Sequence, residues 1–494
     1  MSRPHAARTP VLVGVGQSIE RERIVTVLDL TERAARAAFK DAPGLSGQIE
    51  RVTTISAVFS PGGKAPSTEL ASRLGLGDVH CETTTPGGNT PQWVVTRAAA
   101  DIAAGKLGST LIVGAEATRS MRAADPEASF MGGSRARGTA LQEPEPVVGP
   151  SMSGVLSKAE VEAGFVRPAD VYPVFDSALA ASASRSPAQQ REHIGRLEAP
   201  FTRVAAANPF AWFRDELTPS DISEASASNR LTAEPYTKRM NAFPNVDQGS
   251  ALLLTSLELA REAGLADQCV FPWAGATNAD VAPAARRELG DSPAVRAAAH
   301  ALFGALGIGI DDMEWIDLYS CFLSAFQVGA KAIGLATDDE RGLTVTGGMP
   351  FFGGPGNNYS SHAIASIALR LRESGRLGYV AANGGFLSKH SLGVYGSEPP
   401  PGGFRSLDTS QEQAKIPASA LPVSTEASGQ ATVVGGTVVY GRDGSVESAP
   451  VIATLDDGRR IVAKAEPAIL SSLAEQSMVG SRISVTGSPP IYKL

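Results

Sequence analysis

Cysteine, aromatic residues and clustered positive charge are all scarce in this sequence, and each shortage excludes a class of protein. Only three cysteines occur in 494 residues, and aromatic residues make up 6% of the chain. Cys81, Cys269 and Cys321 lie far apart in apolar or strand-like surroundings, which excludes a disulfide framework and a zinc site. Separated thiols of this kind fit a reducing compartment, so we expect a cytoplasmic protein without a metal centre.

Charge and hydrophobicity exclude two further kinds of partner. The formal net charge is −7, and lysine and arginine are scattered along the chain rather than gathered in a stripe. A basic surface for the phosphate backbone of nucleic acids is therefore not expected. No apolar run approaches the length of a transmembrane helix, and residues 1–10 lack the apolar centre of a signal peptide. We expect neither membrane insertion nor secretion.

Glycine, by contrast, is abundant, and the segment Thr346–Ser360 concentrates it. This segment runs directly into the apolar pattern of residues 362–369, which predicts a loop followed by a helix. Glycines let a backbone approach a ligand closely, and the first turn of a helix has unpaired N–H groups, so the segment is interpreted as a binding loop. Its spacing matches neither common phosphate-binding pattern, because no Lys-Ser/Thr pair follows the glycines and no clean G-x-G-x-x-G opens the helix.

Strand and helix patterns alternate along most of the chain. The alternation begins with an apolar strand at Pro10–Gly16 and a helix over Thr26–Ala42. It weakens between about residues 118 and 240, which indicates a long insertion, and it resumes at Ser250–Thr255. The second part, up to about residue 398, repeats the pattern of the first. Strands separated by helices indicate a parallel or mixed sheet that is covered on both faces.

The C-terminal part follows a different pattern. Pro399–Gly403 breaks the chain and a polar stretch extends to about residue 426, which is typical of a linker. Short β-rich runs follow, separated by turns such as Asp456–Gly458, with one short helix expected near residues 468–474. We predict a small antiparallel barrel of the OB type over residues 427–494. No basic groove with stacking aromatic residues is visible, so we expect this barrel to contact a protein or to cover an acyl chain.

Two motifs carry a family resemblance. Pro235–Met240 followed by Asp247–Leu252, and the glycine-rich motif Ala382–Tyr395, resemble the thiolase superfamily, most closely the sterol-carrier-protein-2-type thiolases and the acetyl-CoA acetyltransferases. The resemblance covers residues from about 8 to 398. It implies an α/β thiolase fold, in which two similar βαβαβαββ halves form a layered α-β-α-β-α core. The expected domains are residues 8–265 with the loop-domain insertion, residues 266–398, a linker at 399–426 and the additional barrel at 427–494.

The same resemblance implies that the residues of thiolase chemistry are replaced. The family's nucleophilic cysteine, which belongs at a helix N-terminus, falls on Gly88. The His-Asp-Cys-Phe or Asn-Glu-Ala-Phe element begins here with Tyr319, and the Gly-His-Pro element has Gly354 in place of its histidine. The second cysteine, which acts as acid and base, falls on Ala382 or Asn383. We therefore predict that thiolytic and Claisen reactions through an acyl-cysteine do not occur.

Three functions remain open for a thiolase-like chain of this kind. The first is a pseudoenzyme of lipid metabolism that binds an acyl-CoA or lipid-like ligand without turnover. The second is an acyltransferase or lyase that acts on CoA thioesters without a cysteine nucleophile, by a retro-aldol step in which tyrosines such as Tyr319 and Tyr359 take part. The third is an interaction protein that acts through the barrel. Gly88 and Gly354 are expected to widen the floor of a pocket, and the candidate pocket residues are Asn89, Tyr319, Asn358, Tyr359, His362, Asn383 and His390.

Cofactor and oligomeric state follow from the same resemblance. No cofactor is required by these functions, and a CoA thioester is the ligand that the resemblance implies. Thiolases pair through the strand before the nucleophile helix, and here that strand, Cys81–Thr85, is polar and is followed by Pro86. Monomer and homodimer therefore both remain open, as does a protein partner of the barrel.

Overall fold

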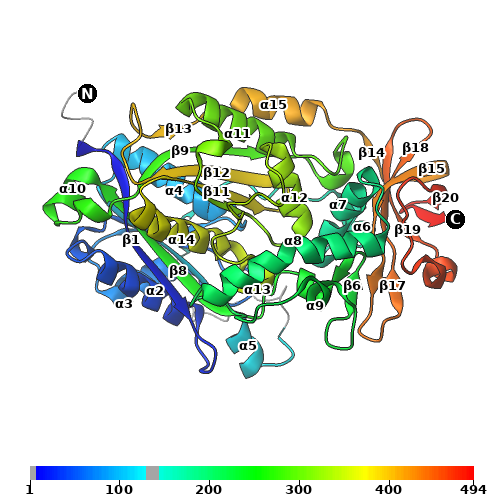
Figure 1. Cartoon of the computed structure of the whole chain (residues 1–494), viewed down its shortest axis with the longest axis horizontal. Coiled ribbons are helices and arrows are strands. Elements are labelled where there is room, and N and C mark those ends of the chain that lie inside the picture. The colour runs from blue at the N-terminus through cyan, green and yellow to red at the C-terminus, as the bar shows by residue number, and fades with distance from the viewer. Residues whose placement is uncertain (1–6, 129–143) are drawn as a thin grey trace.

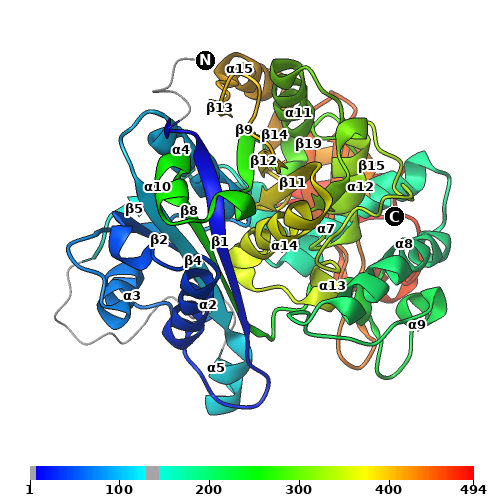
Figure 2. The same cartoon turned by 60° about the vertical axis from the view of Figure 1, so that its left-hand side comes forward.

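Five layers of helices and sheets make up the main body of the molecule. The computed structural model describes residues 7–128 and 144–494. Two mixed sheets lie on either side of two central helices, and further helices cover the outer face of each sheet (Figure 1 and Figure 2). This arrangement confirms the predicted layered core with its two similar halves.

The first half forms a six-stranded sheet with the strand order β1-β8-β4-β2-β3-β5. Its strands are β1 (Pro10–Ile19), β2 (Arg51–Ile55), β3 (His80–Thr84), β4 (Ser109–Ala117), β5 (Val147–Val148) and β8 (Asp247–Ser256). The helices α2 (Val27–Asp41) and α3 (Pro66–Leu74) cover its outer face, and α10 (Leu257–Glu262) follows β8. The helix α2 packs closely on β1 because Gly16 has no side chain, and a Cβ there would lie 2.6 Å from the Ala38 nitrogen.

The second half forms a five-stranded sheet with the strand order β10-β11-β12-β9-β13. Its strands are β9 (Phe271–Ala279), β10 (Trp315–Leu318), β11 (Leu377–Gly384), β12 (Lys389–Gly396) and β13 (Arg405–Ser406). The helices α11 (Pro293–Leu306) and α12 (Leu323–Ala332) lie on its outer side. The central helices are α4 (Thr90–Ala103) and α14 (Tyr359–Ser374), and their apolar residues fill the core between the two sheets. The start of each central helix is therefore held deep inside the molecule.

The described part of the insertion is mainly helical, and most of its helices pack on the second half. Its helices and strands are α5 (Thr118–Ala124), α6 (Lys158–Glu162), α7 (Pro168–Ser182), α8 (Pro187–Ala207), α9 (Pro219–Ser223), β6 (Leu231–Ala233) and β7 (Tyr236–Thr237). Aromatic residues of α7 and α8 share one apolar core with α12 and with the short helix α13 (Met349–Phe352) of the glycine-rich segment. Tyr172 of α7 stacks on Phe322 with their ring centroids 4.7 Å apart.

The C-terminal part is a closed five-stranded barrel with a core of its own, as the sequence predicts. Its strands are β15 (Ala427–Gly436), β18 (Val451–Leu455), β19 (Arg460–Ala465), β20 (Arg482–Gly487) and β21 (Ile491–Lys493). They pair in the cyclic order β15-β18-β19-β21-β20, and the parallel pairing of β19 with β21 closes the ring. The short helix expected near residues 468–474 is a 3-10 helix at Pro467–Leu473.

The barrel is docked on the insertion rather than suspended from the chain, at one end of the molecule (Figure 1). Its strands β16 (Val439–Tyr440) and β17 (Val446–Ser448) continue the β6 and β7 hairpin of the insertion into a four-stranded sheet. The Tyr440 hydroxyl donates to the Glu234 carboxylate at 3.0 Å, and the Arg460 guanidinium donates to the Arg287 carbonyl oxygen at 3.0 Å. These bonds fix the barrel against both the insertion and the second half.

Residues 399–426, predicted from their composition as a linker, also contact the second half. They contain β13, α15 (Ser410–Ala418) and β14 (Val423–Ser424). The Gln413 side chain accepts a hydrogen bond from the Ala279 N–H at 2.6 Å and donates one to the Ala279 carbonyl at 2.9 Å. This segment therefore follows the surface of the second half on its way to the barrel.

The strand through which thiolases pair is covered within this chain. The strand β5 pairs in parallel with β3, and the N–H groups of Thr83 and Thr85 donate to the carbonyl oxygens of Pro146 and Val148 at 2.9 and 2.8 Å. At the C-terminal end of β3, these N–H groups are thus not available to a partner subunit. Among the described residues, no helix has both the length and the apolar character needed to cross a lipid bilayer.

Candidate functional site

The loop before α4 occupies the centre of the molecule, where the two halves meet. Gly87 has φ +147°, a conformation that side chains disfavour, and its N–H donates to the Asn357 side-chain oxygen at 2.9 Å. The Ser360 hydroxyl donates to the Gly88 carbonyl oxygen at 2.8 Å. The glycine-rich segment of the second half therefore holds the loop at which the family's nucleophile is expected.

The space beside Gly88 is filled by a tyrosine. A Cβ built on Gly88 would overlap the Tyr319 hydroxyl oxygen and would lie 2.5 Å from the Asn383 carbonyl oxygen. Tyr319 comes from the turn after β10, and its side chain is buried. The expectation that Gly88 widens a pocket floor is therefore wrong, because the phenol of Tyr319 takes up the volume that the glycine leaves.

Gly354 has a looser environment than Gly88. A Cβ built on Gly354 would meet the Phe243 carbonyl oxygen at 3.5 Å and the Ala242 Cβ at 3.6 Å, which are ordinary van der Waals distances. The Gly354 N–H donates to that same Phe243 oxygen at 2.9 Å. A Cβ is therefore sterically allowed at Gly354, the expected position of the activating histidine.

Asn383 is held by a tyrosine of the insertion that the sequence analysis missed. Its side-chain nitrogen donates to the Tyr172 hydroxyl oxygen at 3.0 Å, and the Leu387 N–H donates to the same oxygen at 3.2 Å. Burial raises the pKa of the neighbouring Cys321 thiol to about 12 and that of the Tyr172 phenol well above its ordinary value. No periodicity in the insertion marks Tyr172, since its partner lies more than two hundred residues away.

The other two cysteines are equally poor nucleophiles. Burial raises the pKa of Cys269 to about 11. Burial also raises the pKa of Cys81, and the negative charge of Glu145 adds to this effect. None of the three thiols is ionised to a useful extent at neutral pH, and none stands at the start of α4.

Tyr359 and Asn358 belong to a buried hydrogen-bond network at the start of α14. The Tyr359 hydroxyl lies 2.6 Å from the Thr346 hydroxyl and donates to the Asp317 carboxylate at 3.3 Å. Burial raises the Asp317 pKa to about 6, although several hydrogen bonds favour its charged form. The Asn358 side chain donates to the Gly114 carbonyl at 2.8 Å and so ties the loop to β4. These contacts are those of a structural clamp.

The two predicted histidines contact different parts of the fold. His362 lies in the first turn of α14, where its Nδ1 is 2.7 Å from the Gln17 side-chain oxygen, and burial lowers its pKa to about 3. The Nε2 atom of His390 lies 3.3 Å from the carboxylate of Asp280, a residue that also accepts hydrogen bonds from Ser292 at the start of α11. The structure does not bring the two histidines together in one pocket.

Asn89, the remaining candidate, is buried at the start of α4. Its side-chain nitrogen donates to the Ser391 hydroxyl of β12 at 3.2 Å. The neighbouring Lys389 is a second residue that the sequence analysis missed, although it lies within the motif that carries the family resemblance. Its side chain is 5% exposed, and its Nζ has no hydrogen-bond partner in residues 7–128 and 144–494. A charged residue at the start of a strand that is buried along its whole length was the available signal.

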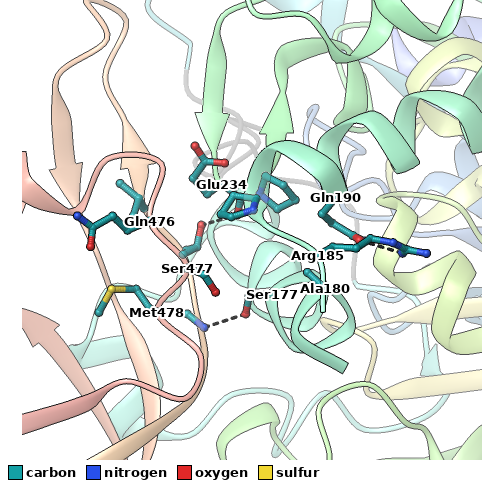
Figure 3. A pocket seen from close by; sticks show the side chains of 13 residues that line it. Ser177, Ala180, Arg185, Gln190, Glu234, Gln476, Ser477 and Met478 are labelled. Atoms are coloured by element: carbon teal, nitrogen blue, oxygen red, sulfur yellow. Dashed lines mark hydrogen bonds between the residues drawn. The ribbon is translucent and has the colours of Figure 1, made fainter. Parts of the chain in front are cut away.

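Two cavities lie away from these residues. One of about 30 Å³, enough for about two waters, separates α7 from the barrel, with Ser177 and Gln190 on one side and Gln476 and Met478 on the other (Figure 3). A second of about 170 Å³ lies beside Trp93 and the edge strand β13. Neither cavity is lined by any of the predicted pocket residues. In the described part of the chain, no group of side chains is suited to hold a metal ion.

Comparison with known proteins gives the family. No protein-family model and no curated protein sequence matches the chain. The crystal structure of a monomeric SCP2-thiolase-like protein type 1 from Mycobacterium smegmatis is similar to it with a TM-score of 0.84 and 31% identity, over 99% of each chain. The chain belongs to the SCP2-thiolase-like proteins. Because the match covers 99% of both chains, the barrel is part of what this SCP2-thiolase-like chain shares with its relative.

Two more distant structures share the fold with this SCP2-thiolase-like protein. The Ltp2–ChsH2(DUF35) aldolase has a TM-score of 0.60 and 19% identity over 79% of this chain and 98% of its own. The Acat5 thiolase from Ascaris suum, in complex with coenzyme A, has a TM-score of 0.56 and 15% identity over 78% of this chain and 99% of its own. These two structures confirm the predicted fold, and the 31% identical relative confirms the predicted resemblance to the SCP2-type thiolases.

Proposed function

We propose that this SCP2-thiolase-like protein binds an acyl-CoA or lipid-like ligand and has no thiolase activity. The observation that carries the proposal is the filling of the space at Gly88 by the Tyr319 hydroxyl. A thiolase needs a thiolate at the N-terminus of this helix, where the helix dipole and backbone N–H groups stabilise it. Here the position has neither a nucleophile nor room for one.

The remaining thiols do not supply the missing chemistry. With its pKa raised to about 12 by burial, the Cys321 thiol keeps its proton at pH 7. Its neighbours Tyr172 and Tyr319 keep their protons as well, because burial raises both phenol pKa values. Hydrogen-bond donation and ligand positioning are the roles that such groups support.

The test is a search for an acyl-enzyme together with a binding titration. The full chain is incubated with acetyl-CoA and with acetoacetyl-CoA and CoA, and its intact mass is measured, while calorimetry follows the binding of CoA, acetyl-CoA and a long-chain acyl-CoA. We expect an unchanged mass, no thiolysis, and saturable binding of at least the long-chain ester. A covalent acyl adduct would refute the loss of thiolase chemistry. Absence of binding at millimolar concentration would refute the proposal that the protein binds an acyl-CoA.

A retro-aldol lyase is the second candidate, and one observation favours it. The Tyr319 phenol lies beside Gly88, the position to which the family resemblance assigns the reacting group, with the Tyr359 ring 5.4 Å from the Tyr319 ring and Asp317 bonded to Tyr359. Such a reaction needs a base and a donor to the enolate oxygen rather than a nucleophile. Cleavage of a β-hydroxyacyl-CoA that is lost in Tyr319→Phe would support this candidate over passive binding.

We further propose a cytoplasmic monomer in which residues 427–494 form a fixed wall for the ligand or a surface for a protein partner. The covered β3 edge and the monomeric relative support the monomer. The docking of β16 on β6 supports a barrel that does not swing away from the insertion. Light scattering on the purified chain tests this, since a stable dimer would contradict it.

A further inference from the structure

Lys389 stands next to the loop before α4, as the register of β12 shows. Along the face of β12 that meets α4, Gly393 lies against Gln92, and Ser391 accepts a hydrogen bond from Asn89 at 3.2 Å. Lys389 is the next residue on this face, because side chains alternate along a strand. It therefore lies beyond the first turn of the helix, on the side of its N-terminus.

The strand next to β12 gives the same position independently. Lys389 pairs directly with Gly384 of β11, so their Cβ directions share one face of the sheet. A Cβ built on Gly384 would lie 2.9 Å from the Gly88 nitrogen and 3.2 Å from the Gly87 Cα. The side chain of Lys389 thus leaves the sheet directly beside the loop that contains Gly87 and Gly88.

The ammonium group of Lys389 is buried without a counter-ion in the described part of the chain. Its Nζ has no hydrogen-bond partner there, and its residue is 5% exposed. Burial lowers the pKa of this amine, and no carboxylate offsets the effect. The N-terminus of the fourteen-residue helix α4 adds a further positive partial charge. An unpaired charge in this place costs stability, and a bound anion would offset that cost.

We propose that the ligand of this protein is a free carboxylic acid, whose carboxylate binds the Lys389 ammonium at the N-terminal end of α4. This inference rests on the proposed ligand-binding function and narrows it from an acyl-CoA or lipid-like molecule to the acid itself. The carboxylate supplies the missing negative charge, and the helix N-terminus stabilises the same charge. A neutral thioester carbonyl would leave the ammonium unpaired.

The cover of the site is a loop of the insertion. Val155 lies against Gly385. A Cβ built on Gly385 would lie 2.6 Å from the Val155 Cγ1 atom and 3.8 Å from the Lys389 Cγ atom. Residues 151–157 around Val155 form no helix or strand, and several of them are exposed. Displacement of this loop breaks few backbone bonds, so it is the way by which an acid enters.

The test compares an acid with its neutral isostere on the full chain. Calorimetry and thermal unfolding are measured with octanoate, octanamide and octanoyl-CoA for the natural protein, Lys389→Met, Lys389→Arg and the control Lys106→Met, which changes an exposed lysine beyond the other end of α4. We expect octanoate to bind about a hundredfold more tightly than octanamide, because the neutral amide leaves the buried Lys389 ammonium without a charged partner. Lys389→Met should bind octanoate about a hundredfold more weakly than the natural protein does. Lys389→Arg should recover part of this affinity, and Lys106→Met should bind octanoate as tightly as the natural protein.

Stability without ligand provides a second readout. Lys389→Met should unfold at a higher temperature than the natural protein, because an unpaired buried charge is removed, and octanoate should stabilise the natural protein but not the variant. Should Lys389→Met fail to fold, Lys389→Gln repeats the comparison with a polar neutral side chain. Equal binding of octanoate and octanamide, or unchanged binding in the folded variant, overturns the inference. Binding of octanoyl-CoA independent of Lys389 overturns the inference alone, and absence of all binding overturns the proposed function with it.

Discussion

The loops that precede the two central helices resemble each other in sequence and differ in packing. The loop before α4 is tightly packed, because the Tyr319 hydroxyl occupies the space beside Gly88. Before α14, Gly354 leaves room for a Cβ. Both glycines stand where the thiolase resemblance predicts a catalytic group, so the loss of the two groups has been accommodated by the structure in two different ways.

The polar groups around the two loops also differ, in their hydrogen-bond partners and in their charge. At the start of α14, Asn357, Asn358 and Tyr359 each make a hydrogen bond to the framework, and the buried atoms left without a partner in the described residues, Asn358 Oδ1 and His362 Nε2 among them, are neutral. At the start of α4, the Lys389 Nζ has no partner in the described residues. An unpaired buried ammonium costs more than an unpaired neutral atom, and a bound anion would offset that cost. We therefore assign a structural role to the start of α14 and a binding role to the start of α4.

The largest effect is expected from Gly88→Ala. The added methyl group overlaps the Tyr319 hydroxyl, so we expect the free energy of unfolding to fall by about 3 kcal/mol, as measured by urea unfolding. The matched experiment is a double-mutant cycle with Tyr319→Ala, which removes the phenol but leaves the Asn383 carbonyl oxygen 2.5 Å from the built Cβ. In that background Gly88→Ala should still destabilise the protein, but by at least about 1 kcal/mol less than in the natural protein. An equal cost in both backgrounds would show that Tyr319 is not what fills the space.

An intermediate effect on stability is expected from lowering the pH, and it acts through His362 at the start of α14. The folded pKa of His362 is lowered to about 3 by burial, below the ordinary value of 6.5, so below pH 6.5 the unfolded chain binds a proton that the folded chain does not. Stability is therefore lost as the pH falls from 6.5 towards 3. Between pH 7 and pH 5 this histidine should cost the protein about 2 kcal/mol.

The variant His362→Gln isolates this contribution from those of other groups. Asp317, with its pKa raised to about 6, acts in the opposite direction, because its folded form takes up a proton first. Urea unfolding at pH 7 and pH 5 should thus show a smaller acid-induced loss in His362→Gln than in the natural protein. The same loss in both would mean that His362 is accessible to protons, and that the start of α14 is less closed than its packing indicates.

Most of the fold could be predicted from the sequence because the main strands and helices are long and periodic. The apolar runs that become β1 and β8 are buried along their length, and continuous apolar runs of this kind are recognised in a sequence as buried strands. The barrel was predictable from its short strands and turns. Its docking was not, because β16 and β6 have two and three residues, too few for any period to appear.

The site was predictable only as a set of replaced positions. A resemblance to the family assigns Gly88 and Tyr319 to their positions, yet it contains no volumes, so the contact between them could not be foreseen. Tyr172 contacts Asn383 across more than two hundred residues of sequence, and nothing local marks it. Lys389 was overlooked because the glycines around it dominate the motif. Its meaning depends on burial and on the absence of a partner, which are properties of the folded chain alone.

The smallest effect is expected from Gly354→Ala, and it tests the comparison most sharply. The methyl group would make only ordinary contacts with Ala242 and with the Phe243 carbonyl, and the backbone bond from Gly354 to that carbonyl stays intact. The free energy of unfolding should change by less than about 0.5 kcal/mol, and octanoate binding should be unaltered. Urea unfolding beside Gly88→Ala gives the contrast directly. A loss as large as that of Gly88→Ala would mean that the loop before α14 is as tightly filled as the loop before α4. In that case the two loops would not differ in packing, and the binding role of the start of α4 would rest on the unpaired Lys389 alone.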